Sequence, residues 1–176
     1  MSDQAGDERN RMNGQYSNLV AEDLFKLLLH LEIQKAVRLQ YCVSVICLTP
    51  DLPDLPNQTI DPGLPRQIAE SAVRQLRGTD VATIFSSGGS VGLMLIDADT
   101  RTLGQILDRA TDAARVTMGQ AVARQDQPRQ DQPISLSAGA SCYPETATSG
   151  RDLLRQATEL MGRARAEGGN RLYLPS

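Results

Sequence analysis

Residues 80–96 read Asp80-Val-Ala-Thr-Ile-Phe-Ser-Ser-Gly-Gly-Ser90-Val-Gly-Leu-Met-Leu-Ile96, and this stretch decides the fold. Its two ends, 81–85 and 91–96, are short apolar runs of the kind that form neighbouring strands. Between them, Gly88 and Gly89 can adopt the positive φ angles that a tight turn requires. The stretch therefore predicts a β-hairpin with a turn rich in serine and glycine.

The segments around this hairpin alternate between helical and strand patterns. Apolar residues at helical spacing predict a helix from Ala21 to just before Cys42, and the run 43–48 predicts a buried strand. The prolines within 49–57 predict a loop that is neither helix nor inner strand. This order predicts an α/β protein, an α+β sandwich with a mixed sheet of about five strands covered by helices. The other expected elements are helices over 64–76, 100–122 and 152–166, and strands over 134–141 and 171–174.

The chain has 176 residues, which is the length of one domain. Residues 1–20 are polar and contain glycine, so we expect a flexible N-terminal tail followed by one domain over 21–176. Residues 125–133 repeat Asp-Gln-Pro twice, which predicts an exposed connecting loop.

Composition excludes several classes of protein. The net charge of −3 argues against nucleic-acid binding, which needs a basic face. No signal peptide opens the sequence, and no apolar run approaches the roughly 20 residues needed to span a bilayer. We therefore expect a cytoplasmic protein without a membrane partner. The three cysteines lack metal-ligand spacing, so the sequence predicts neither a metal site nor a cofactor.

Three segments resemble the GGDEF domain of diguanylate cyclases. Ser135-Leu-Ser-Ala-Gly-Ala-Ser141 is similar to the family's strand that ends in Ser-Ile-Gly, and residues 153–170 are similar to its last helix, LLxxADxALYxAKxxGRN. Arg77-Gly-Thr-Asp80 is similar to the RxxD inhibitory site, which precedes the family's GG(D/E)EF turn by five residues. By order of elements the resemblance covers residues 24–174. It places the turn on Ser86, Ser87, Gly88, Gly89 and Ser90.

The resemblance implies a two-metal cyclase site, and the sequence departs from that site at the metal ligands. In the family, the ions lie on the first Asp of a strand-end DxD motif and on an acidic residue of the turn. The corresponding residues here are Thr49 and the turn glycines, whereas Mg²⁺ needs anionic oxygen ligands. Asp51 and Asp54 are the nearest substitutes, and Arg165 takes the place of the phosphate-binding lysine. We therefore predict a degenerate GGDEF-like domain that is not an enzyme.

The RxxD string implies a binding function. In the resembling family this arginine contacts a guanine edge or a phosphate of cyclic di-GMP, and the aspartate accepts from base N–H groups. A further arginine in the next helix often completes that site, and the aligned residue is Arg109, with Arg115 as the weaker choice. The alternative is a structural Arg–Asp pair, because Arg109-Ala-Thr-Asp112 is a second such string and ion pairs within a helix explain such strings.

The leading hypothesis is a catalytically inactive receptor of cyclic di-GMP that uses Arg77, Asp80 and Arg109. A homodimer bridged by the ligand is compatible with it. One alternative is a nucleotide-independent module that binds a protein partner through the first helix or a sheet edge. Another is a regulator that binds GTP without turnover through Arg165 and the Ser/Gly turn. The position of Asp80 separates these hypotheses, because a carboxylate locked in the interior removes the receptor and leaves the interaction module.

Overall fold

The computed structural model describes residues 18–51, 62–123 and 135–175. The predicted loops over 52–57 and 125–133, and with them Asp54, lie outside the described residues. Within the described ranges, no helix has the length and apolar character needed to cross a lipid bilayer. The elements are β1 (Leu19–Val20), α2 (Glu22–Leu39), β2 (Val43–Asp51), α3 (Leu64–Val73), β3 (Val81–Ile84), β4 (Val91–Ile96), α4 (Thr100–Ala123), β5 (Ser135–Tyr143), α5 (Gly150–Ala166) and β6 (Leu172–Tyr173).

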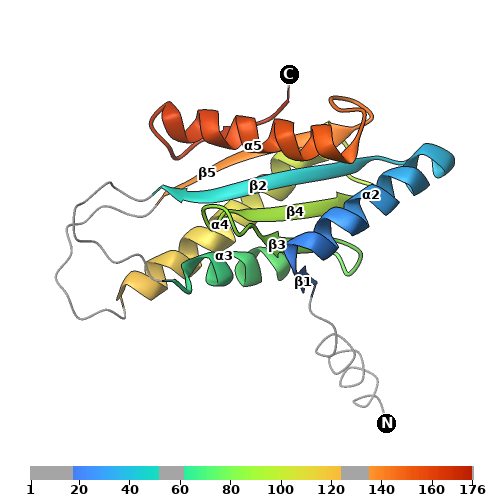
Figure 1. Ribbon diagram of the computed structural model, residues 1–176. Helices are drawn as coiled ribbons and strands as arrows, with labels where there is room; N and C mark the ends of the chain where they lie inside the picture. Colours follow the sequence, from blue (N-terminus) through green and yellow to red (C-terminus); the bar gives the residue numbers. More distant parts are fainter. Residues whose placement is uncertain (1–17, 52–61, 124–134, 176) are drawn as a thin grey trace, which may run out of the picture.

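One mixed sheet forms the centre of the molecule (Figure 1). Its strands lie in the order β1-β3-β4-β2-β5-β6, and β2 is antiparallel to both β4 and β5. The edge strands β1 and β6 run parallel to their neighbours β3 and β5. The predicted α+β sandwich is confirmed, with six strands in the sheet where about five were expected.

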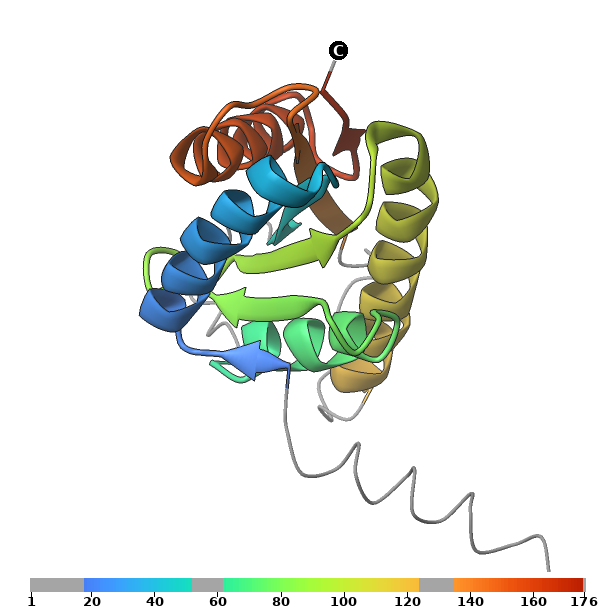
Figure 2. The same ribbon diagram turned by 90° about the vertical axis from the view of Figure 1, so that its right-hand side faces the viewer.

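Helices cover both faces of the sheet (Figure 2). Along β2, Ile46 and Leu48 belong to the core under α3 and α4, whereas Val45 and Cys47 belong to the core under α2 and α5. This burial on both faces explains why the strand is a continuous apolar run in the sequence. Burial also raises the pKa of the Cys47 thiol to about 11, so this cysteine is a neutral packing group at neutral pH.

Strand β2 continues through Thr49 and Pro50 to Asp51, so the prediction of a loop starting at residue 49 is wrong by three residues. The reason lies in the pairing. Strand β4 accompanies β2 only as far as Leu48, whereas β5 accompanies it to Asp51. Beyond Leu48 the strand has one neighbour, and a proline without an N–H group is tolerated there.

The last residues of the predicted tail belong to the domain. Leu19 and Val20 form β1, parallel to β3, and the Ala82 N–H donates to the carbonyl of Asn18 at 2.8 Å. The Asn18 side-chain amide also donates to the carbonyl of Asp80 at 2.8 Å. Two strand residues are too few for a recognisable sequence pattern, so the tail prediction can apply only to residues 1–17, which lie outside the described residues.

Candidate functional site

Four elements meet at one end of the sheet. The pairing of Leu48 with Val91 brings the β3–β4 turn close to the end of β2, and the pairing of Asp51 with Ser135 adds the start of β5. The C-terminal end of α5 lies at the same end, which is the left side of Figure 1. These are the elements that the sequence resemblance assigns to a cyclase site, and we call this region the β2 end.

The β3–β4 turn is held by a residue that the sequence analysis did not single out. The Ser86 N–H and hydroxyl both donate to Glu22 Oε2, at 2.8 and 2.7 Å, and Lys26 Nζ contacts Glu22 Oε1 at 2.6 Å. These three donors lower the pKa of the Glu22 carboxyl to about 2. The Phe85 ring packs edge-on against Phe25 of α2, with ring centroids 6.1 Å apart. Glu22 is remote from the turn in sequence, and no spacing rule relates the two.

The turn itself offers no acidic side chain. Gly88 and Gly89 have φ angles of 86° and 65°, which favour glycine, and Ser90 closes the turn by accepting the Phe85 N–H at 2.8 Å. A Cβ atom on Gly89 would lie 3.0 Å from the Pro65 side chain at the start of α3. The predicted turn is therefore present, and its second glycine has little room for a side chain.

Asp51 has a structural environment. Its Oδ1 accepts from the Ser137 hydroxyl at 2.7 Å, and its Oδ2 accepts from the Ser135 hydroxyl at 2.8 Å and the Asn170 N–H at 2.7 Å. A Cβ atom on Gly169 would lie 2.8 Å from this carboxylate. The carboxylate thus joins β2, β5 and the turn after α5.

The other residues of the β2 end complete this picture. Thr49 is 6% exposed and pairs with Ser137 across the sheet. Arg165 is exposed on the last turn of α5 and has no hydrogen-bond or ion-pair partner among the described residues. In the parts of the chain that the structure describes, no group of three His, Cys, Asp or Glu side chains could hold a metal ion.

Asp80 lies at the opposite end of β3 and is buried, with 4% of its surface exposed. Its Oδ2 accepts the Arg77 N–H at 2.9 Å, and its Oδ1 accepts the Ile96 N–H at 3.0 Å. The carboxylate therefore closes the turn after α3 and fixes it to the end of β4. The sequence suggested a surface carboxylate here, and only the tertiary structure shows that it is committed to the backbone.

The arginines of the predicted ligand site are exposed. The Arg77 guanidinium has no hydrogen-bond or ion-pair partner within the described ranges, and Arg109 Nε donates to the Gln105 carbonyl of its own helix at 3.4 Å. Asp112, which ends the second RxxD string, forms its ion pair with Arg115 outside the string, at 3.3 Å between Oδ1 and Nη1. Arg115 also donates to the Asn170 side chain at 2.8 Å. The structure thus leaves the Arg77 and Arg109 side chains exposed, whereas the Asp80 carboxylate is buried.

Comparison with known proteins adds a result at the level of the fold. No family model matches the sequence, and no curated protein matches it. Among solved structures, the GGDEF domain of YfiN from Pseudomonas aeruginosa has a TM-score of 0.67 at 20% identity, covering 90% of this chain and 97% of that one. The GGDEF domain of DgcB from Caulobacter crescentus, solved in complex with c-di-GMP, has a TM-score of 0.73 at 15% identity, with coverage of 90% and 92%. The chain has the GGDEF-domain fold.

A third structure with the GGDEF fold was solved with a protein partner. The diguanylate cyclase SiaD from Pseudomonas aeruginosa, in complex with its activator SiaC, has a TM-score of 0.70 at 16% identity, covering 97% of this chain and 66% of that one. At sequence identities of this size, the similarity establishes the fold alone. The properties of the site in this GGDEF-fold chain therefore have to be argued from its own residues.

Proposed function

We propose that this GGDEF-fold domain is non-catalytic and acts through contacts with other protein chains. The observation that carries the proposal is the state of the two carboxylates at the β2 end. Asp51 and Glu22 each accept three hydrogen bonds, and all of these donors come from the protein itself. Binding a divalent cation would require breaking these hydrogen bonds, and Thr49 and the turn glycines supply no anionic oxygen in exchange.

The buried position of Asp80 favours protein contacts over a nucleotide ligand. A guanine base needs an accessible acceptor for its N–H groups, and both oxygens of Asp80 already accept backbone N–H groups. In contrast, α2 carries four exposed leucines on an outer layer of the fold, Leu24, Leu27, Leu31 and Leu39. Apolar patches on a surface helix are typical of protein interaction sites.

Incubation with GTP tests the absence of catalysis. With either Mg²⁺ or Mn²⁺, we expect no cyclic di-GMP and no pyrophosphate above a protein-free control. We also expect no shift in melting temperature with GTP and Mg²⁺, because Arg165 alone does not form a triphosphate site. Turnover would contradict the proposal, and a melting shift without turnover would favour a GTP-binding regulator.

Photo-crosslinking in cells tests the protein contacts. With a photoreactive residue at position 27, we expect a protein adduct that grows with illumination. The matched control is the same residue at position 116, because Val116 is an exposed apolar side chain on α4, on the other face of the sheet. Equal labelling at both positions would contradict a specific contact through α2.

The buried Asp80 removes a receptor that reads the base through this carboxylate. A second candidate is a cyclic di-GMP receptor that uses the arginines alone, Arg77 and Arg109, and the observation that favours it is the unpaired, exposed guanidinium of Arg77. In this candidate the arginines contact phosphates and guanine edges, and Asp80 holds the turn that carries Arg77. Titration calorimetry at 100 µM ligand should then give heat that Arg77→Ala abolishes. Arg151→Ala, at an exposed arginine of α5, serves as the control. Absence of heat from the unmodified protein would remove this candidate.

A further inference from the structure

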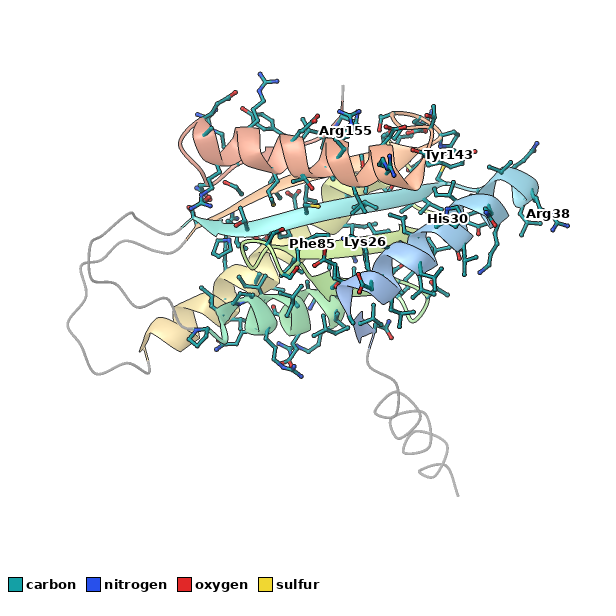
Figure 3. All side chains as sticks on the ribbon, viewed as in Figure 1. Lys26, His30, Arg38, Phe85, Tyr143 and Arg155 are labelled. Carbon is teal, nitrogen blue, oxygen red and sulfur yellow. The ribbon has the colours of Figure 1, made fainter. Side chains whose placement is uncertain are left out.

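Two of the cysteines meet at the end of the sheet opposite to the β2 end. Cys42 directly precedes β2, and Cys142 lies near the end of β5. Cys142 pairs with Ser44 across the two antiparallel strands, so Cys42 and Cys142 are diagonal neighbours on the same face. Both side chains pack into the core under α3 and α4. Figure 3 shows Tyr143, the residue after Cys142, at this end of the sheet, on the right of the view.

The two thiols interact directly, although they are far apart in the sequence. Burial is the main cause that raises the pKa of both thiols, to about 11 for Cys142. The interaction between the thiols raises the pKa of Cys142 further and lowers that of Cys42. Cys42 is half-buried whereas Cys142 is buried, so a small molecule in solvent reaches Cys42 first. Exposure and ionisation both make Cys42 the more reactive thiol of the pair.

A disulfide between these residues requires a small movement of the backbone. The two Cα atoms of a disulfide lie within about 7 Å, and diagonal neighbours in a sheet are about 7–8 Å apart, so the movement is roughly 1 Å. Cys42 precedes Val43, the first residue of β2 that pairs with β5, so the ladder between these strands does not fix its position. The Cys42 carbonyl accepts the Asp97 N–H at 2.8 Å, which ties Cys42 to the connection between β4 and α4.

We propose that Cys42 and Cys142 form a reversible disulfide that couples oxidation by a hydroperoxide to the start of α4. The Cys42 thiolate attacks a peroxide oxygen, and the S–O bond forms as the O–O bond breaks, which leaves a sulfenic acid. The displaced oxygen takes up the proton that the Cys42 thiol lost and leaves as water or an alcohol. The Cys142 sulfur then attacks the Cys42 sulfur, the S–S bond forms as the S–O bond breaks, and the leaving hydroxide takes up the Cys142 proton as water. The two thiols lose two electrons in total, and the hydroperoxide gains them.

The movement that closes the disulfide gives it the properties of a switch. A disulfide that holds the backbone away from its relaxed position is strained, and strained disulfides are reduced more readily. The movement also draws the Cys42 carbonyl away from the Asp97 N–H, so oxidation loosens the connection to α4. The Ala98 carbonyl loses the Cys142 thiol as a donor at 3.7 Å but keeps the Ser44 hydroxyl at 2.7 Å. Because burial disfavours both thiolates, we expect closure to take minutes to hours, which suits a response to sustained oxidation.

Thiol counting after oxidation tests the disulfide. The reduced full chain is incubated with excess hydrogen peroxide for several hours, and the remaining thiols are alkylated after unfolding. We expect one of the three cysteines to stay reactive, in a monomer that has lost two hydrogen atoms, and dithiothreitol to restore all three thiols. Three remaining thiols, or a disulfide between two copies of the chain, would overturn the proposal.

Single substitutions assign the roles of the two cysteines. Cys47→Ala is the matched control, because Cys47 is buried in the core under α2 and α5, and this variant should form the disulfide at an unchanged rate. Cys42→Ala should keep both remaining thiols reduced, whereas Cys142→Ala should stop at a sulfenic acid on Cys42 that dimedone traps. Thermal melting verifies that each variant folds. A disulfide in Cys42→Ala, or no trapped sulfenic acid in Cys142→Ala, would contradict these roles.

Hydrogen exchange tests the coupling to α4. We expect about 10-fold faster exchange at the Asp97 amide in the oxidised protein than in the reduced one, because this amide loses its acceptor. The Asn170 amide at the β2 end should exchange equally in both forms, since its acceptor Asp51 is remote from the thiols. Equal exchange at Asp97 in both forms would overturn the coupling. The thiols take no part in GTP turnover or in crosslinking at position 27, so failure of the disulfide leaves the proposed function untouched.

Discussion

At the scale of single residues, two carboxylates act as caps for the backbone. Asp80 accepts the N–H groups of Arg77 and Ile96 from a buried position. Glu22 accepts the N–H group of Ser86 and so fixes the β3–β4 turn to α2. In both cases a side chain satisfies donors that the loop cannot pair by itself, and at Asp80 burial makes these hydrogen bonds costly to lose.

Asp80→Asn should destabilise the protein by about 1–3 kcal/mol, because an amide nitrogen replaces one of two acceptors that face backbone N–H groups. Urea unfolding measures this change. Asp112→Asn is the matched control, since Asp112 ends the second RxxD string and its side chain is 71% exposed. We expect Asp112→Asn to change the free energy of unfolding by less than about 0.5 kcal/mol. Equal effects of the two changes would contradict a capping role for Asp80.

The hydrogen bonds of Glu22 predict a pH dependence. Its pKa is lowered from 4.5 to about 2 in the folded protein, so the stabilisation is present above pH 4.5 and is lost as the pH falls through 2. In this window Glu22→Gln should flatten the decrease in melting temperature with falling pH. Melting curves of both proteins between pH 5 and 2 measure the difference. Parallel curves would show that the carboxylate contributes nothing to folding.

At the scale of elements, close contact between α5 and the sheet depends on one glycine of β5. A Cβ atom on Gly139 would lie 2.3 Å from both the Ala157 carbonyl oxygen and the Met161 nitrogen. These are backbone atoms of a helix, so they cannot move aside as a side chain would. The helix therefore packs directly on the strand at this position.

Gly139→Ala should destabilise the protein by about 3 kcal/mol or prevent folding, because the helix has to move away from the sheet. Gly162→Ala is the control in the same pair of elements. Gly162 is exposed on α5 with nothing within 4 Å of its added Cβ atom, so alanine there should stabilise by about 0.5–1 kcal/mol. Chemical denaturation gives both values, and a tolerated alanine at position 139 would contradict the close packing.

At the scale of the whole molecule, Asp51 connects segments that are far apart in the sequence. Its carboxylate accepts from Ser135, Ser137 and Asn170, more than 80 residues away. Arg115 of α4 reaches the same turn through the Asn170 side chain. The position that resembles a metal-ligand motif in the sequence therefore holds the β2 end together.

Asp51→Ala should lower the melting temperature and speed hydrogen exchange at the Asn170 amide, which loses its acceptor. Asp108→Ala, at an exposed position of α4, should change neither quantity. Hydrogen exchange followed by mass spectrometry reads the segment that contains Asn170. Unchanged protection there would contradict the connecting role of Asp51.

The amino-acid sequence by itself determined the hairpin, the order of elements and the mixed sheet between helices. These features depend on the local periodicity of apolar residues and on glycine in the turn, which act over a few neighbouring positions. The sequence also showed which residues occupy the positions of the family's metal ligands. Only a local alignment of Thr49 and the turn with the family's motifs is needed for that.

The tertiary structure alone decided how the charged side chains are used. Whether Asp80 and Asp51 face solvent or accept backbone and side-chain donors depends on partners brought near by folding, such as Ile96 for Asp80 and Asn170 for Asp51. The extension of β2 through Pro50 depended in the same way on where β4 ends. Hydrogen-bond partners remote in the sequence leave no local pattern, so a string such as RxxD cannot by itself distinguish a ligand site from a backbone cap.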